Sequence, residues 1–206
     1  MEATHEVFNQ PEPLVNYNLF ETNRPLQDAL KFNAPELDTA GLTQLGAALG
    51  TAEMQTHARL ANVHGPELHT HDRFGRRIDQ VEFHPSYHAL MSASVRAGLH
   101  GTPWAEMAPT LVASRTTLPP GGAELRLGRP GASFALPTLA ASPHVLRAAG
   151  FMLFTELEPS TLCPISMTYA VTPALRGNQA IYADWAPKLT SRQYDPALRP
   201  WQDKPG

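Results

Sequence analysis

The longest hydrophobic pattern in the chain lies in residues 145–157, where apolar side chains fall on almost every face of a helix. Only Arg147, Thr155 and Glu156 interrupt it. A helix that is apolar on most faces has to be surrounded by other elements. The pattern therefore predicts a central helix that is buried on most sides.

A second helix is predicted after a short turn at residues 159–161. Pro164 is compatible with its first turn, because N–H groups there have no partner within the helix. The helix is expected to end before Pro173, and Ser166 and Thr168 place small hydroxyls among apolar neighbours. Its predicted buried stripe consists of Leu162, Ile165, Tyr169 and Thr172.

The rest of the pattern predicts a mainly α chain with irregular parts. Helices are expected at 25–31, 85–98 and 178–189, and either one helix or two with a joint at 36–62. Residues 68–83 fit a small hairpin or an ordered loop. The segment boundaries are an extended N-terminal arm at 1–24, helices at 25–106, a Pro/Gly-rich insertion expected to be disordered at 107–142, core helices at 143–192 and an irregular end at 193–206.

Composition limits the classes of partner and compartment. The chain has 206 residues, 16 Lys and Arg against 19 Asp and Glu, and a net charge of −3, so no basic surface is indicated. The single cysteine, Cys163, excludes an intrachain disulfide and suits the reducing cytoplasm. The N-terminus lacks the apolar core of a signal peptide. The apolar run at 148–157 is shorter than the roughly 20 residues that span a bilayer, so no membrane role is expected.

Candidate chemistry is sparse. Nine histidines raise the question of a metal site, yet no carboxylate or cysteine completes a ligand set at ordinary spacing, and ordinary surface or capping roles are favoured. Cys163 has no nearby base, so a small buried thiol is favoured over a nucleophile. No phosphate-binding or nucleophile-elbow motif occurs. Arg73, Arg76 and Arg77 form the one basic cluster, interpreted as a solvated turn with a phosphate contact as the alternative.

Five separate blocks, in the same order, resemble one known family. They are VFNQPEPLVNYNLF, LGTAEMQTHARLANVHGPEL, RFGRRIDQVEFHPSYHALM, LCPISMTYAVTPAL and YDPALRPWQDKPG. Together they resemble the N-terminal part of AidB-like proteins, the adaptive-response branch of the acyl-CoA dehydrogenase flavoproteins. Residues 107–142 depart from that family, which has a much shorter connection there.

The resemblance implies a fold, and it implies which functional segments of the family lie outside this chain. The fold would be the N-terminal helical domain of the acyl-CoA dehydrogenase fold, truncated before the β domain, with residues 193–206 as the linker toward it. The intact family uses FAD to oxidise CH–CH groups. Its flavin-binding and catalytic-base segments lie beyond this chain, so no catalytic or cofactor-binding residue is assigned here, and FAD is not expected to be retained. No metal is expected either.

The resemblance also suggests sites of contact. It places part of the substrate-cavity wall beside the flavin at Leu162, Cys163, Pro164, Ile165, Ser166, Met167 and Thr168. It implies a homo-oligomer in which the N-terminal arm packs against a neighbouring subunit. The resemblance makes DNA a possible partner of the full-length family. The net charge of −3 argues against DNA binding by this part. A non-catalytic assembly module and a DNA-protecting protein of the alkylation response remain as alternatives.

Overall fold

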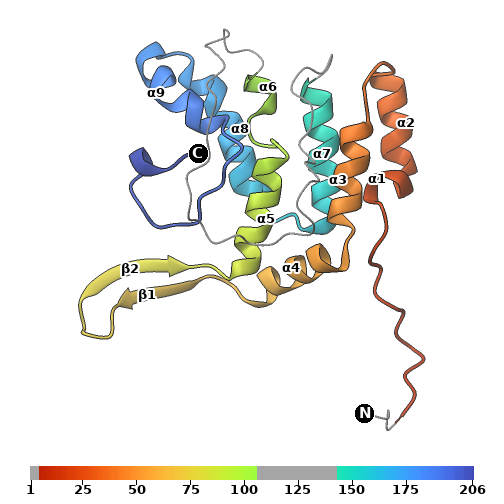
Figure 1. Ribbon diagram of the computed structural model, residues 1–206, viewed down its shortest axis with the longest axis horizontal. Coiled ribbons are helices and arrows are strands. Elements are labelled where there is room, and N and C mark those ends of the chain that lie inside the picture. The colour runs from red at the N-terminus through yellow and green to blue at the C-terminus, as the bar shows by residue number, and fades with distance from the viewer. Residues whose placement is uncertain (1–4, 106–142) are drawn as a thin grey trace, which may run out of the picture.

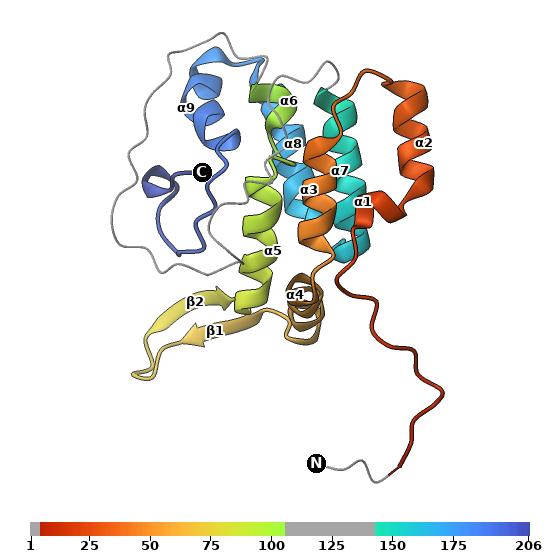
Figure 2. The same cartoon turned by 45° about the vertical axis from the view of Figure 1, so that its right-hand side comes forward.

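The computed structural model describes residues 5–105 and 143–206, and these are mainly helical. Helices stand side by side in a flattened body, with a hairpin and an extended N-terminal arm projecting from one end (Figure 1). Figure 2 shows α3, α5, α7 and α8 in the middle of the body. The elements are α1 (Leu19–Thr22), α2 (Arg24–Asn33), α3 (Ala40–Leu49), α4 (Ala52–Val63), β1 (Glu67–His71), β2 (Arg77–Glu82), α5 (Pro85–Arg96), α6 (Thr102–Ala105), α7 (Pro143–Leu157), α8 (Leu162–Leu175), α9 (Gln179–Leu189) and the 3-10 helix η1 (Trp201–Asp203).

The extended arm ends at Asn18, earlier than the expected residue 24. The Asn18 side chain accepts hydrogen bonds from the backbone N–H groups of Phe20 and Glu21, which starts α1. Leu19 and Phe20 are then buried against α3, where Gly46 allows the close approach. A Cβ at Gly46 would lie 2.6 Å from the Phe20 nitrogen. The last part of the arm is therefore anchored in the core.

Residues 36–62 contain two helices rather than one. The joint lies at Gly50, whose absent side chain leaves room for the Tyr17 carbonyl, since a Cβ there would come within 1.7 Å of that oxygen. Thr51 begins α4 by accepting a hydrogen bond from the Met54 N–H at 3.2 Å. Of the two alternatives that the sequence left open, the joined pair is present.

Residues 67–82 form a hairpin that projects from the body (Figure 1). Leu68 pairs with Val81 across two antiparallel strands, and the register shifts before the turn. In the turn, the Asp72 carboxylate accepts hydrogen bonds from the N–H groups of Phe74 and Arg76. Gly75 has a φ of +77°, which a glycine adopts without strain. The hairpin alternative is thus the correct one.

Helix α7 is central but is not buried on most sides. Leu146, Leu153 and Phe154 are completely buried against α3 and neighbouring helices. Met152, by contrast, is 52% exposed, and Thr155 and Glu156 are exposed beside it. The described chain therefore covers only part of this apolar helix, which corrects the expectation of burial on most sides.

A buried carboxylate joins α7 to α8. Glu158 is 1% exposed and follows directly after α7. Its carboxylate accepts hydrogen bonds from the backbone N–H groups of Ser160, at 3.0 Å, and Thr161, at 2.8 Å, as well as from the Ser160 hydroxyl and the Asn62 amide. Burial by itself raises the pKa of Glu158, but these hydrogen bonds outweigh burial and lower it.

Glu158 should therefore stabilise the fold in its ionised form. Replacing it by Gln (Glu158→Gln) turns an amide NH2 toward backbone donors, and should cost about 1.5–3 kcal/mol of unfolding free energy at pH 7. Because the folded pKa is lowered, the wild-type advantage is fully present above the ordinary carboxyl pKa of 4.5 and disappears as the pH falls through the folded pKa. Urea unfolding of both proteins at several pH values measures this.

The exposed Glu36 provides the matched control. Glu36→Gln should leave the unfolding free energy within about 0.5 kcal/mol of wild type. A Glu158→Gln protein as stable as Glu36→Gln at pH 7 would show that the carboxylate does not hold the turn.

Candidate functional site

Helix α8 continues through Pro173 to Leu175, so the predicted end before Pro173 is wrong. Proline has no N–H to donate to the carbonyl four residues earlier, which belongs to Tyr169. That carbonyl instead accepts a hydrogen bond from the Trp104 indole N–H at 2.8 Å. A side chain of α6 thus replaces the missing backbone donor, and the helix extends by a further turn.

This substitution of donors can be tested by a double-mutant cycle. Trp104→Phe leaves the Tyr169 carbonyl without its donor and should destabilise the chain by about 1–3 kcal/mol, part of it through lost packing. In a Pro173→Ala background, the restored N–H can serve that carbonyl, so the same Trp104→Phe change should cost measurably less. Urea unfolding of the four proteins gives the coupling free energy. Equal costs in both backgrounds would contradict the donor exchange.

The structure divides the seven predicted wall residues, Leu162–Thr168, among three environments. Leu162 and Ile165 are buried in the core at 3% and 2% exposure. Pro164, Ser166 and Thr168 are half-buried, and the Thr168 hydroxyl donates to the Pro164 carbonyl at 3.1 Å. Cys163 is exposed, which contradicts the expected buried thiol. Met167 is 68% exposed.

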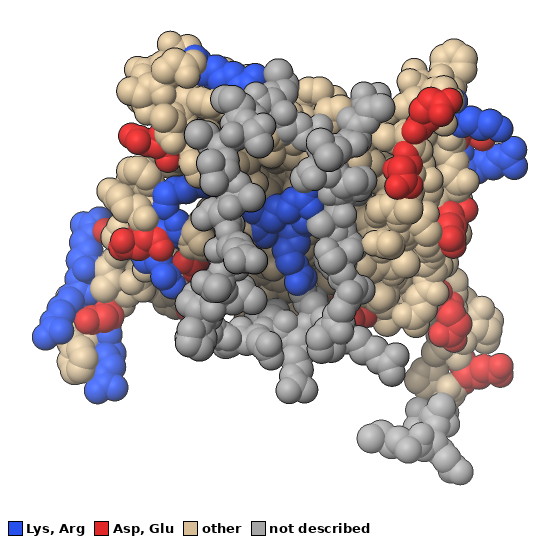
Figure 3. Space-filling view, turned by 45° about the horizontal axis from the view of Figure 1, so that its top comes forward, with Lys and Arg blue, Asp and Glu red and all other residues tan. Residues whose placement is uncertain are grey.

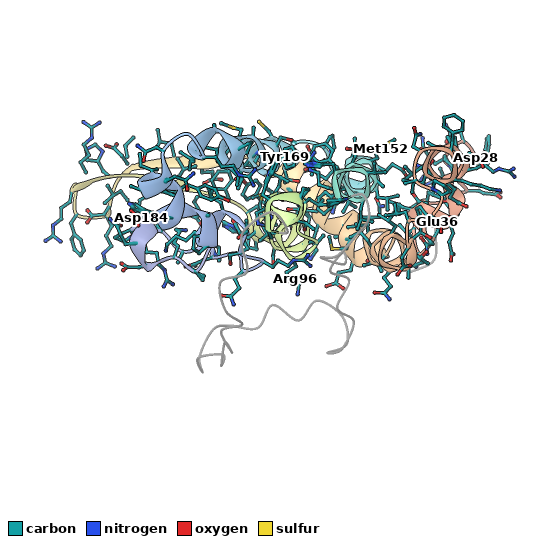
Figure 4. The ribbon with its side chains drawn as sticks, turned by 90° about the horizontal axis from the view of Figure 1, so that it is seen from above. Asp28, Glu36, Arg96, Met152, Tyr169 and Asp184 are labelled. Atoms are coloured by element: carbon teal, nitrogen blue, oxygen red, sulfur yellow. The ribbon has the colours of Figure 1, made fainter. Side chains whose placement is uncertain are left out.

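Four side chains on the packed helices α7 and α8 are exposed, and three of them share one face of α8 at four-residue spacing. The open face is defined by these side chains, Met152, Cys163, Met167 and Val171. Figure 4 shows Met152 and the neighbouring Tyr169 on the same side of the flattened body, opposite Arg96. Contiguous exposed apolar side chains on adjacent helices mark a surface for interaction. Among the described residues, the exposed positions of this face on α8 carry no carboxylate, histidine or lysine.

A cluster of aromatic and basic side chains borders the open face. The Tyr169 hydroxyl lies 2.7 Å from His144 Nδ1, and its ring lies 5.0 Å from the ring of Trp104. Arg147 stacks on the Tyr169 ring, with its guanidinium carbon 4.0 Å from the centroid of that ring. In the sequence, Arg147 only interrupts an apolar pattern, and no sequence signal brings it to Tyr169.

Arg147 is partly desolvated in this position. Its Nε donates to the Leu99 carbonyl at 2.8 Å, while its Nη2 is buried and has no hydrogen-bond acceptor among the described residues. Burial lowers the pKa of Arg147, although an arginine remains charged at any ordinary pH. Stacking on Tyr169 and Phe151 therefore provides most of the contacts of this charge.

A cavity of about 250 Å³ lies on another side of α8. Its walls come from α5, α8, α9, His100 and residues 191–206, and three of the predicted wall residues, Pro164, Ile165 and Thr168, line it. Its lining is largely apolar, including Trp185 and Trp201, whose rings stack 4.3 Å apart. The predicted segment thus contributes both to this cavity and to the open face.

Other candidate chemistry finds no support in the described ranges 5–105 and 143–206. No group of three His, Cys, Asp or Glu side chains there could hold a metal ion. No helix in those ranges is long and apolar enough to cross a membrane. Arg73 and Arg76 stack on the exposed Phe74 at the hairpin tip, and Arg77 pairs with Asp79. On the face in Figure 3, basic and acidic side chains are mixed toward the left edge, basic side chains lie in the middle, and mostly acidic ones line the right side.

Solved structures establish the class of fold. The chain is similar to Caenorhabditis elegans ACDH-11 in complex with C11-CoA, with a TM-score of 0.58 and 15% identity over 93% of this chain and 29% of that one. It is also similar to the apo-form of Bd2924, with a TM-score of 0.62 and 23% identity over 90% of this chain and 32% of that one. The predicted fold, the N-terminal helical domain of the acyl-CoA dehydrogenase fold, is confirmed.

Sequence comparison then gives the family. Residues 9–118 and 129–196 match the family model named adaptive response protein AidB N-terminal domain. The chain belongs to this family. It is 39% identical over 204 residues to the putative acyl-CoA dehydrogenase AidB of Escherichia coli (strain K12), covering 98% of the chain and 32% of that relative. The chain thus spans about a third of the length of the curated relative it matches.

The family match also bears on the expected insertion at 107–142. The two matched ranges leave residues 119–128 between them, and these lie within the predicted insertion. Its expected disorder concerns residues outside the described ranges.

The open face predicts that Cys163 is a reactive probe. As the one cysteine of the chain and an exposed one, it should react with one equivalent of a thiol reagent such as dithionitrobenzoate, without denaturant. The rate should match that of the urea-unfolded chain within about tenfold, since access limits the reaction of an ordinary thiol. Protection that disappears only on unfolding would place Cys163 in the core.

Proposed function

We propose that this chain acts as the N-terminal helical domain of an AidB-type flavoprotein and supplies one wall of its cofactor and substrate chamber. The open face of α7 and α8 carries this proposal, because it leaves Met152 and Met167 more than half exposed. Apolar surface on a central helix pair is stabilised when another layer covers it. The partial coverage of the curated relative is consistent with such a layer lying in the remaining two thirds of an AidB-type protein.

In this proposal the intact protein is an FAD-dependent oxidoreductase acting on an acyl thioester or another hydrophobic substrate. FAD would supply the oxidation chemistry, and this chain would exclude water and position groups. The described residues offer no carboxylate at the exposed α8 positions, which fits a wall without a catalytic base. ACDH-11, whose structure contains C11-CoA, provides a related fold with an acyl-CoA-type ligand.

The division of the chain follows from the same proposal. Residues 25–106 and 143–192 would form the helical domain, and residues 193–206 would lead toward a β domain. The arm up to Asn18 would contact a neighbouring subunit of a homo-oligomer, since Val7, Phe8 and Leu14 are 58%, 90% and 73% exposed. We place the protein in the cytoplasm. DNA binding by this part is not proposed, because the chain has a net charge of −3 and its composition indicates no basic surface.

A chimera tests the proposal. In it, this chain replaces the matching third of the Escherichia coli relative, and flavin retention is measured by visible absorbance after purification. The chimera should retain flavin, whereas the 206-residue chain alone should not. Met167→Asp should reduce flavin retention at least tenfold in the chimera, because burying an unpaired carboxylate costs several kcal/mol, yet should leave the stability of the isolated chain unchanged within about 0.5 kcal/mol.

Glu36→Asp on the exposed loop before α3 is the matched control and should retain flavin fully. Cys163 should also become protected from thiol reagents in the chimera. A chimera that folds, binds flavin and tolerates Met167→Asp with Cys163 still reactive would refute the proposed wall.

A further inference from the structure

The last described segment, residues 191–206, is a loop that is held on the helical body, and we call it the strap. It leaves α9 and returns toward it (Figure 1 and Figure 2). Trp201 of η1 stacks on Trp185 of α9, with the ring centroids 4.3 Å apart. A Cβ on Gly206 would lie 2.5 Å from the Ser191 hydroxyl oxygen, so the first and last residues of the strap are packed against each other.

Two histidines attach the first part of the strap to the body. His100 Nε2 donates a hydrogen bond to the Ser191 carbonyl at 2.8 Å, because a carbonyl only accepts. The Tyr194 hydroxyl lies 2.7 Å from Nδ1 of His88 on α5. Neither contact reaches the second part of the strap, residues 195–206.

Lys188, near the end of α9, attaches that second part. Its ammonium donates to the carbonyls of Trp201, Gln202 and Lys204, which uses all three of its N–H groups. Within the described ranges, Lys188 is the one residue outside the strap that forms hydrogen bonds with residues 195–206. Three bonds to one ammonium fix the carbonyls relative to one another as well as to α9.

The strap is also cross-linked within itself. The Lys204 ammonium donates to the carbonyls of Asp195 and Ala197, at 3.0 and 2.8 Å. The Asp195 carboxylate pairs with Nε of Arg199 at 3.0 Å. Because residues 195–204 are tied together in this way, a single directional anchor outside them decides whether they lie on α9.

We propose that Lys188 is a positioning residue, whose ammonium locks the strap onto α9 and thereby fixes the direction in which the chain leaves the helical domain. The second part of this inference rests on the proposed function, in which a further layer covers the open face. A layer joined through a fixed strap is preorganised for that face, because it loses less conformational freedom when it docks. The stack of Trp185 on Trp201 adds apolar contact to the lock but no directional bond.

Nitrogen-15 NMR relaxation of the 206-residue chain tests the lock without any flavin. The backbone order parameters of residues 201–204 should be about 0.85 in wild type, as in rigid backbone, and should fall below about 0.6 in Lys188→Met. Methionine keeps most of the apolar stem of lysine but has no donor for the carbonyls. Lys31→Met, the same change at an exposed position of α2, should leave these order parameters unchanged. Unchanged order in Lys188→Met would overturn the lock.

Restoring the ammonium chemically separates its role from that of the rest of the side chain. In a Cys163→Ser background, Lys188→Cys supplies a single thiol, which bromoethylamine converts in urea into a thioether analogue of lysine before refolding. Iodopropane converts the same thiol into a neutral side chain of matching length. The order parameters of residues 201–204 should return to about 0.85 with the ammonium and stay below about 0.6 with the neutral chain. Equal order after both alkylations would contradict a role for the charge.

The chimera with the Escherichia coli relative tests the consequence for assembly. In it, Lys188→Met should lower flavin retention at least about threefold, because a mobile strap lowers the effective concentration of the covering layer. Lys31→Met should retain flavin fully. Full retention in Lys188→Met, together with a mobile strap in the 206-residue chain, would overturn the positioning role. A wild-type chimera without flavin would count against the proposed function instead, while the order parameters of the 206-residue chain would still decide whether Lys188 is the lock.

Discussion

The turn between α7 and α8 is the constraint on which the rest of the structure depends. Glu158 fixes it by collecting the backbone donors of Ser160 and Thr161 on one buried carboxylate, and the Asn62 amide links that carboxylate to α4. With this turn fixed, Leu153 and Phe154 are buried in the core, where α7 packs on α3. Met152 and Met167 remain on the open face. The same turn directs Ile165 toward α5 and the cavity. A sequence motif of four residues thus decides which side of α8 can meet a partner.

Much of this arrangement follows from local sequence. Prolines at first helical turns and apolar periodicity predict where the helices lie, because these signals act within a few residues. The five family blocks identified the domain, since each couples several such signals in order. The sequence periodicity did not predict the burial of α7 correctly. An apolar helix such as α7 predicts surroundings that cover it, but the pattern does not say whether those surroundings belong to the same segment of chain.

The remaining discrepancies arise from contacts that are distant in sequence. The end of α8 could not be predicted at Leu175, because the donor that compensates for Pro173 is Trp104, 65 residues from the carbonyl it serves. Likewise, Arg147 and His144 converge on Tyr169 only once α7 and α8 are packed. The expectation that Cys163 is buried came from its apolar neighbours, yet α8 turns that position outward while burying Leu162 and Ile165. Sequence neighbours on a helix do not share a face.

The two sides of α8 differ in what could complete them. The open face consists of flexible thioether and aliphatic side chains without hydrogen-bonding demands, so any apolar layer of matching shape stabilises it, and the selectivity of a chamber there would have to come from the covering layer. The cavity on the other side is partly open, and its lining from α5, α8, α9 and residues 191–206 is largely apolar. One helix therefore contributes exposed side chains to a surface that another layer can cover and other side chains to a cavity whose lining belongs to the same chain.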